Sequence, residues 1–171
     1  TDELKGDISK ATGIIPENIM ITAVHTHGGP SPRTTDSDVQ NTVPAYVSYL
    51  KERLITMTSA ATKNVVPVKM GISKGSCNLN INRRALIANG SIWLGRNPDG
   101  PCDHDLVVAR FEDMNKKTLA VLINWPCHGT VSGQDNYQIT GDWPGAAARY
   151  IKTNEGNDVV VAVTIGASGD I

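Results

Sequence analysis

The sequence predicts a layered α/β domain in which helices flank a mixed β-sheet. Helical patterns occur near both ends of the chain, at residues 2–12 and 142–154. Short apolar runs bounded by Gly, Asn, Asp and Pro fill the middle, and such runs are typical of strands. A continuous apolar run at 158–165 indicates a strand that is buried on both faces. Helices that alternate with such strands indicate a layered α/β architecture.

The N-terminal region predicts a helix, a strand, a loop and a second helix. Residues 2–12 have helical composition and stop at Gly13, a residue type that commonly ends helices. A β-rich run at 19–24 predicts a short buried strand. The Gly-, Pro- and Ser-rich stretch at 28–42 predicts a loop. Apolar residues at helical spacing over 43–57 then predict a long amphipathic helix.

Five strands are expected in the middle of the chain, because apolar runs alternate there with Gly, Asn, Asp and Pro clusters. The runs cover residues 65–73, 81–88, 91–95, 106–112 and 119–125. Asn89-Gly90-Ser91 between two of these runs matches a glycosylation sequon. Asn-Gly in this position is also typical of a tight hairpin turn, and we favour the turn.

The C-terminal region predicts a loop at 126–141, a helix that begins at Asp142 and a strand at 158–165. Asp142 is followed shortly by a proline, so we expect it to be the N-cap of the helix. A Gly-rich segment at 166–171 follows the strand. Because such a segment normally leads into another element, we expect residues 1–171 to be part of a single domain that is truncated at its C-terminal end.

Composition excludes several classes of partner. The chain has 171 residues, 40% of them hydrophobic, which is enough for a globular unit with a sizeable core. No apolar run is long enough to span a bilayer. Sixteen basic residues nearly balance seventeen acidic ones, and without a basic block a nucleic-acid partner is not expected. Cys77, Cys102 and Cys127 form no Cys-x-x-Cys pair, so neither a thiolate zinc site nor a disulfide framework is indicated.

The chain begins at Thr1 rather than Met and shows no charged segment followed by an apolar one. We therefore expect that any targeting sequence was removed or lies outside these residues. The compartment and the oligomeric state stay open, with a secreted or periplasmic parent protein among the options.

Two histidines follow the expected strand at 19–24. His25 and His27 are one residue apart, so on an extended chain they point to the same side. Gly28-Gly29-Pro30 comes next and lets backbone approach closely. The carboxyl ends of strands are where open α/β sheets bind ligands. A metal or catalytic site is one interpretation, and a strand-capping histidine beside a solvent-facing one is the other.

A third histidine has the same setting. His128 follows the expected strand at 119–125 and precedes Gly129. Neutral imidazole is the commonest zinc ligand, and a catalytic zinc site takes three protein ligands, sometimes four, with room for water. His25 and His128 are thus a candidate pair of ligands, with a structural role for each as the alternative. The candidates for a third ligand are Asp142, Asp170 and His27.

The remaining histidine and a pair of arginines have less specific settings. His104 precedes the expected strand at 106–112, at the opposite strand end, and we expect it at the surface. Arg83 and Arg84 follow a polar segment in which asparagines alternate. A guanidinium presents several fixed donors, so one arginine could bind a substrate oxygen. A solvated arginine at a strand end is the alternative.

Five segments, taken in order, resemble the N-terminal catalytic domain of the neutral/alkaline non-lysosomal ceramidases. They are Ile21-Thr22-Ala23-Val24-His25-Thr26-His27-Gly28-Gly29-Pro30, Asn80-Ile81-Asn82-Arg83, Asn124-Trp125-Pro126-Cys127-His128-Gly129-Thr130, Thr140-Gly141-Asp142 and Gly169-Asp170-Ile171. The family pattern has a THTHSGP-like strand end, an NINR segment, an N-W-x-x-H-G-T loop, an SGD turn and a GD-type loop. The likeness spans nearly all of the chain, and five motifs in order are more specific than any one of them.

The resemblance implies that the parent protein is a zinc-dependent amide hydrolase that acts on a lipid-like substrate. In that family a Zn²⁺ ion polarises the amide carbonyl and activates a water, and the products are a fatty acid and sphingosine. By this resemblance His25 and His128 are zinc ligands. His27 would contact the substrate near the scissile amide, and Arg83 would bind polar groups of the substrate. The family's other zinc ligands, a Glu and a Tyr, and its catalytic serine would lie beyond Ile171.

The sequence departs from the family pattern near the expected substrate pocket. Val24 stands where the family usually has Thr, Gly28 where it has Ser, and Arg84-Ala85 where it has Ser-Pro. The expected substrate is ceramide or a related N-acyl lipid, and the alternative is a non-sphingolipid substrate on the same fold and zinc site. A non-catalytic fragment of the parent enzyme is another alternative. A sugar- or peptide-binding module with structural histidines is a further one, and it predicts that His25 and His128 are far apart.

Overall fold

The computed structural model describes residues 2–30, 43–133 and 135–171. The chain divides into two compact units. The helical unit comprises Thr1–Thr22 and Pro30–Val66, and the sheet unit comprises Ala23–Gly29 and Pro67–Ile171. All four histidines lie in the sheet unit. The expectation that residues 1–171 belong to a single domain stays a prediction.

The helical unit consists of two helices that pack against each other. They are α1 (Asp2–Thr12) and α2 (Val43–Thr62), and a 3₁₀ turn, η1 (Pro16–Asn18), follows α1. Lys51 of α2 pairs with Asp7 of α1 at 2.7 Å and with Glu3 at 2.8 Å. These ion pairs are partly exposed and are expected to add little stability. Both predicted helices are confirmed, and α2 runs five residues further than the periodicity indicated, from 57 to 62.

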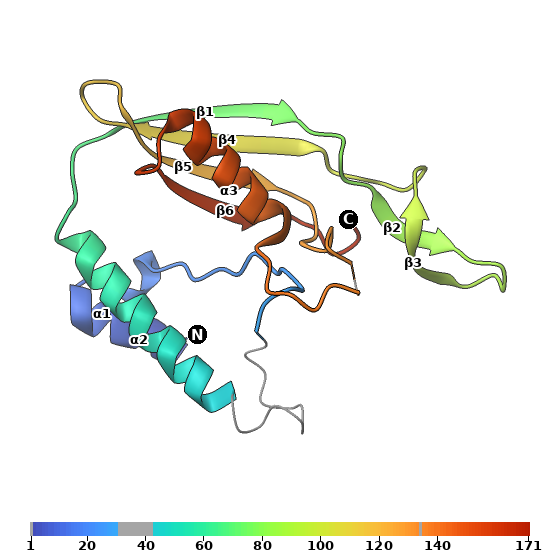
Figure 1. Ribbon diagram of the computed structural model, residues 1–171, viewed down its shortest axis with the longest axis horizontal. Coiled ribbons are helices and arrows are strands. Elements are labelled where there is room, and N and C mark those ends of the chain that lie inside the picture. Colours follow the sequence, from blue (N-terminus) through green and yellow to red (C-terminus); the bar gives the residue numbers. More distant parts are fainter. Residues whose placement is uncertain (1, 31–42, 134) are drawn as a thin grey trace. The chain divides into compact units, whose positions relative to one another are not determined.

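The sheet unit is built on a four-stranded sheet with the order β1-β4-β5-β6. The strands are β1 (Lys69–Ser76), β4 (Asp105–Glu112), β5 (Thr118–Trp125) and β6 (Val160–Ile165). β4 is antiparallel to both of its neighbours, whereas β5 and β6 are parallel. Parallel neighbours need a crossover connection, and α3 (Asp142–Glu155) supplies it along one face of the sheet (Figure 1). The predicted α/β class with a mixed sheet is confirmed.

The core of the sheet unit lies between the sheet and α3. Val121 and Ile123 of β5 are each 6% exposed, and Val159, just before β6, is 2% exposed. Ala147 and Ile151 of α3 pack against this cluster. Ile123 and Val121 are two residues apart on a strand and therefore point to the same face, which explains how β5 contributes most to the core.

A hairpin made of β2 (Asn82–Leu86) and β3 (Ile92–Asn97) extends from the end of the four-stranded sheet (Figure 1). Asn89-Gly90 forms its turn, with Gly90 at φ 81° and the Gly90 N–H donated to the Ile87 carbonyl at 2.9 Å. The predicted turn is therefore confirmed. The register of β2 against β3 shifts between Asn82 and Arg84, which is the position of Arg83.

Two buried asparagines tie the hairpin to the sheet. Asn80 is 6% exposed and donates its amide hydrogens to the carbonyls of Asp103 at 2.7 Å and Pro126 at 2.6 Å. Asn82 is 2% exposed and donates to the Pro101 carbonyl at 2.8 Å. Buried amides that are fully bonded in this way hold loops in one arrangement. The sequence had indicated only that these asparagines share a face.

The expected strands at 19–24 and 65–73 differ from the structure. Residues 19–24 form no strand, pair with no other described strand, and expose 77% of Met20. Strand propensity is a weak signal without a partner for the backbone, which explains this error. β1 begins at Lys69, after Pro67, because proline has no N–H to donate to a ladder. Residues 31–42 of the expected loop at 28–42 lie outside the described residues.

The expectation that the strand at 158–165 is buried on both faces is wrong. β6 is the last strand in the sheet order, and Val160 is 63% exposed. An apolar run indicates a strand but does not say whether both of its faces are covered.

None of the described helices is long and apolar enough to cross a membrane.

We predict that Asn80→Ala lowers the free energy of unfolding by about 1–3 kcal/mol, because it leaves the buried carbonyl of Pro126 without this donor. Urea denaturation measures the change. Asn78→Ala is the matched control, because Asn78 is exposed and only accepts a hydrogen bond from the Ser76 hydroxyl. An equal loss in the two variants would contradict a structural role for Asn80.

Candidate functional site

The parallel pairing of β5 and β6 brings two loops to the same edge of the sheet. Trp125 and Ile165 are paired at the ends of the two strands, and the loops that follow them carry His128 and Ser168. The backbone N–H of His128 donates to the Ile171 carbonyl at 3.0 Å. A Cβ on Gly166 would lie 3.0 Å from the Cβ of Pro126. The absence of a side chain at Gly166 therefore allows the two loops to lie in close contact.

The segment that carries His25 and His27 docks against the loop after β5. Thr26 forms a parallel bridge with Gly129, and the His27 N–H donates to the Gly129 carbonyl at 3.2 Å. A Cβ on Gly129 would lie 3.0 Å from the Cα of Thr26. His25 has φ 50°, in the left-handed region, where a non-glycine residue is held at some cost by its surroundings. The two histidines thus converge through a turn, not through the alternation of a strand.

The three histidines form one cluster. The ring centroids of His25 and His128 are 4.6 Å apart, those of His25 and His27 are 4.9 Å apart, and those of His27 and His128 are 5.4 Å apart. A ligand nitrogen on each ring lies within 4.8 Å of the others. Of the three candidates for a third ligand, His27 is the one that the structure places in the cluster. A binding module with structural histidines would have His25 and His128 far apart. In the structure the two rings are close together.

The cluster fits a zinc ion in ligand type and approximate spacing. Two ligands at about 2.0–2.1 Å from one tetrahedral zinc lie roughly 3–4 Å apart. The nitrogens of the cluster, which are within 4.8 Å of one another, would need only small side-chain rotations to reach that spacing. His25 and His27 are exposed, so an ion could enter from solvent.

His128 is held more firmly than the other two histidines. Its Nδ1 lies 2.8 Å from the Ser168 carbonyl oxygen and 2.9 Å from Nη2 of Arg83. Burial lowers the pKa of His128, the hydrogen bond to Ser168 opposes this, and the positive charge of Arg83 lowers the pKa further. The ring is therefore held in the neutral form, which is the form that binds metal ions.

Arg83 belongs to β2, and its side chain reaches from the hairpin to the loop at 166–171. Its Nη2 donates to the Gly169 carbonyl at 2.9 Å, and its backbone N–H donates to the Asp170 carbonyl at 2.6 Å. Its Nε is buried and has no hydrogen-bond partner among the described residues. A buried donor without a partner requires an explanation, and a ligand oxygen would provide one.

Three other polar residues stand outside the cluster. Asp142 is not the N-cap, which is Gly141; its buried carboxylate accepts the N–H groups of Trp143 at 2.7 Å and Ser132 at 2.9 Å. Burial opposes ionisation of Asp142, but these backbone hydrogen bonds prevail, and its pKa lies below the usual range. Asp170 pairs with Arg84 at 2.7 Å. His104 is half-buried against Asn80 rather than at the surface, with Nδ1 2.6 Å from the Asn80 Oδ1.

An open cleft of about 590 Å³ adjoins the cluster. It is lined by His27, Gly28, Arg83, Leu94, Gly95, Arg96, Gly129, Thr130, Ser132, Gly133, Asn136 and Asp142. Leu94 is the one large apolar side chain in this set. Arg96 and Asn136 were not predicted as residues of the cleft, because neither belongs to a motif and only the folded hairpin and loop bring them beside His27.

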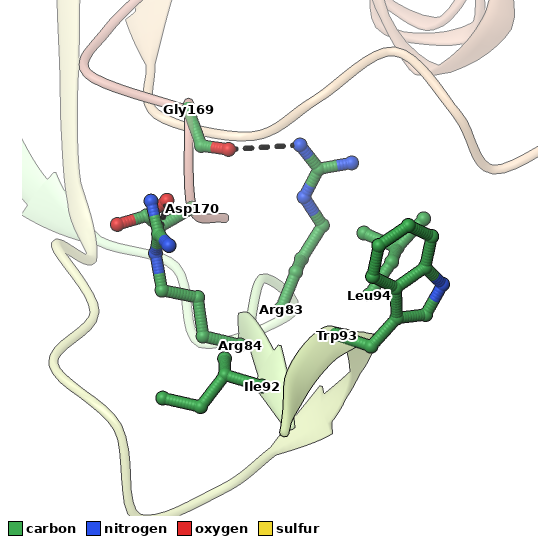
Figure 2. A pocket seen from close by; sticks show the side chains of 7 residues that line it. All are labelled: Arg83, Arg84, Ile92, Trp93, Leu94, Gly169 and Asp170. Atoms are coloured by element: carbon green, nitrogen blue, oxygen red, sulfur yellow. Dashed lines mark hydrogen bonds and ion pairs between the residues drawn. The ribbon is translucent and has the colours of Figure 1, made fainter. Parts of the chain in front are cut away.

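A second hollow, of about 350 Å³, lies beside the first and shares Arg83 and Leu94 with it. Figure 2 shows its lining, in which Trp93 and Leu94 lie on one side of Arg83 and Ile92, Arg84 and Asp170 lie on the other. Ile92, Trp93 and Leu94 are each more than half exposed, at 61%, 70% and 58%. The hairpin therefore offers apolar surface immediately beside the polar cleft.

The fold is shared with two solved ceramidase structures. One, described as "Ceramidase complexed with C2", is 18% identical, with a TM-score of 0.67 over 97% of this chain and 28% of its own. The other, described as "Crystal Structure Analysis of neutral ceramidase from Pseudomonas aeruginosa", is 17% identical, with a TM-score of 0.69 over 98% of this chain and 28% of its own. This chain thus spans 28% of the length of each of these structures.

The family comparison covers nearly the whole chain. Residues 13–170 match the family described as neutral/alkaline non-lysosomal ceramidase, N-terminal. A comparison with curated proteins found no match. The chain therefore belongs to the neutral/alkaline non-lysosomal ceramidase family, in the N-terminal region of that family, and the predicted resemblance is confirmed.

The departure from the family pattern at Gly28 has a local explanation. A Cβ at this position would collide with the Cγ2 methyl of Thr140 and would lie 3.3 Å from the Thr140 backbone nitrogen. The family pattern has serine at the position of Thr140, and serine lacks this methyl group. Glycine at 28 therefore accommodates threonine at 140.

We predict that Gly28→Ser destabilises the protein by about 1–3 kcal/mol through overpacking against Thr140. In the double variant Gly28→Ser/Thr140→Ser we expect much of this loss to be recovered, because the methyl group is gone. Thermal denaturation of the two single variants and the double variant gives the coupling between the positions. Additive effects would contradict this account.

Proposed function

We propose that this chain forms part of the catalytic domain of a zinc-dependent amide hydrolase of the ceramidase type. In this proposal His25 and His128 bind the metal, and His27 and Arg83 contact the substrate. The observation that supports it most is the convergence of three imidazoles, with nitrogens within 4.8 Å of one another, in a chain that belongs to a ceramidase family.

A zinc ion bound here would polarise an amide carbonyl and lower the pKa of a bound water, which together supply an electrophile and a nucleophile. His128 is suited to bind it because its ring is neutral and fixed by backbone contacts. His25 lies on the other segment, with its ring centroid 4.6 Å from that of His128, and it is exposed to solvent. His25 and His128 would thus provide two of the metal ligands, and other groups would provide the rest.

His27 and Arg83 both line the cleft of about 590 Å³. A substrate in this cleft would place its polar centre next to the cluster, where His27 can donate or accept a proton at the amide. Arg83 lines the cleft, and its guanidinium presents several donors, so it can bind a substrate oxygen. A lipid chain attached to the amide can lie against Ile92, Trp93 and Leu94 of the adjacent hollow.

A second candidate function keeps the zinc site and changes the substrate. The cleft contains Arg96 and Asn136 beside Arg83 and has one large apolar side chain, which favours a substrate whose amine part is polar. Hydrolysis of a short-chain ceramide and of an N-acyl amino acid with the same acyl chain separates the two candidates. A higher kcat/KM for the ceramide favours sphingolipid, and the reverse favours the second candidate.

We predict that His25→Ala and His128→Ala each lower kcat/KM for N-acyl amide hydrolysis by more than about 100-fold, since loss of even an outer-shell partner typically costs 10- to 100-fold. Zinc content, measured by atomic absorption, should fall in both variants. His104→Gln is the control, because His104 lies outside the cluster. A folded His128→Ala variant with normal zinc content and activity would refute the ligand assignment.

Substitution of His27 distinguishes between two roles for this residue, a contact to the substrate and a third metal ligand. We predict that His27→Ala keeps the zinc content near the wild-type value but lowers kcat, because the residue acts on the substrate and lines the cleft. Zinc content and steady-state kinetics on the same preparation provide the comparison. A loss of zinc equal to that in His25→Ala would assign His27 to the ligand shell instead.

A further inference from the structure

The side chain of His128 has two possible hydrogen-bond partners at the same ring nitrogen. Nδ1 lies 2.8 Å from the Ser168 carbonyl oxygen and 2.9 Å from Nη2 of Arg83. A carbonyl oxygen can only accept and a guanidinium can only donate. Nδ1 can therefore satisfy one of the two partners at a time, and the choice fixes the tautomer of the ring.

The two tautomers differ in whether Nε2 can bind a metal. When Nδ1 carries the proton and donates it to Ser168, Nε2 keeps its lone pair and can serve as a ligand. When Nδ1 accepts a hydrogen bond from Arg83, Nε2 carries the proton and cannot bind a metal. Arg83 has another acceptor, because the same Nη2 donates to the Gly169 carbonyl at 2.9 Å. In the first tautomer each donor has its own carbonyl acceptor, Ser168 for the ring Nδ1 and Gly169 for Nη2 of Arg83.

The carbonyls of Ser168 and Gly169 are held in place by the hairpin. Arg83 donates to Gly169 through its side chain and to Asp170 through its backbone N–H at 2.6 Å. Arg84 pairs with the Asp170 carboxylate at 2.7 Å. Figure 2 shows the Arg83 guanidinium reaching the Gly169 carbonyl, and Arg84 beside Asp170. Both arginines therefore bind the same short loop.

The shift in register of β2 explains how two successive residues reach the same loop. Successive side chains of a regular strand point to opposite faces. The pairing of β2 with β3 is irregular between Asn82 and Arg84, and such irregularities redirect side chains. The Asn82 side chain accepts the Arg84 N–H at 2.9 Å and stabilises this local geometry.

We infer that Arg83 is a positioning residue for the metal site: it holds the Ser168–Gly169 backbone against His128, so that the ring is kept with its proton on Nδ1 and with Nε2 available to the metal. This inference deepens the proposed function and rests on it, because it assigns to Arg83 a role that acts through His128 in addition to substrate contact. The role does not require substrate, so metal binding alone can reveal it.

The first test is the tautomer of His128 in the metal-free protein, read from the nitrogen chemical shifts of its ring by NMR. We expect a protonated Nδ1 and an unprotonated Nε2 in the wild type. Arg83→Met removes both the hold on the loop and the donor near Nδ1, and we expect a mixture of the two tautomers because the loss of the hold on Ser168 dominates. A folded Arg83→Met variant whose ring keeps its proton wholly on Nδ1 contradicts the positioning role. A wild-type ring with its proton on Nε2 overturns the inference, whether or not the protein binds zinc.

The second test is zinc affinity, measured by competition with a chromophoric chelator. Arg83→Met should weaken binding about 10- to 100-fold, as expected for loss of an outer-shell partner, and Arg83→Lys should recover part of it, because an ammonium can still donate to Gly169. Arg110→Met is the control, since its partners, Glu112 and Glu155, lie outside the loop at 166–171, and it should change affinity less than about twofold. Folding of each variant is checked by circular dichroism.

The outcomes separate the inference from the proposed function. A wild-type protein that binds no zinc contradicts the proposed function, and the NMR result still decides the tautomer. A wild-type protein that binds zinc no more tightly than a folded Arg83→Met variant contradicts the inference and leaves the proposed function standing. If Arg83→Met does not fold, the Arg83→Lys variant and the wild-type tautomer decide the question.

Discussion

The parallel pairing of β5 with β6 is the constraint on which the rest of the site depends. Trp125 and Ile165 are paired at the ends of the two strands, so the chain leaves both strands at the same edge of the sheet. His128 and Ser168 are three residues beyond these ends and meet there. An antiparallel arrangement would have placed the two loops at opposite edges, and His128 would have lacked its backbone partner.

Close approach of backbone is the second requirement of the site. Gly129 lies against Thr26, and Gly166 lies against Pro126, at distances that a side chain on either glycine would make crowded. The indole N–H of Trp143 donates to the Cys127 carbonyl at 3.1 Å, and the ring of Trp143 packs edge-on against Trp125. These contacts limit the movement of the loop after β5, and two segments far apart in sequence can therefore present their three histidines to one point.

The distribution of charge keeps the carboxylates away from the histidines. Asp142 is occupied by backbone N–H groups, and Asp170 is paired with Arg84. Arg83 and Arg96 line the cleft, and neither forms an ion pair with a described residue. Imidazole and guanidinium groups therefore remain to bind ligands in the described part of the site, and they suit a metal ion and a polar substrate.

The α/β class, the helices, most of the strands and the candidate site residues could be predicted from the order of the residues. Periodicity, turn residues and the motifs around His25, His27, His128 and Arg83 are local features, and local features can be read from the order of residues alone. Only the tertiary structure decided which of them meet. It showed that residues 19–24 form no strand, because an apolar run needs a partner for its backbone. It also placed Arg96 in the cleft, the Ser168 carbonyl beside His128, and Asn80 against the loop after β5, because such contacts between distant segments depend on strand order and register, which no short stretch of sequence encodes.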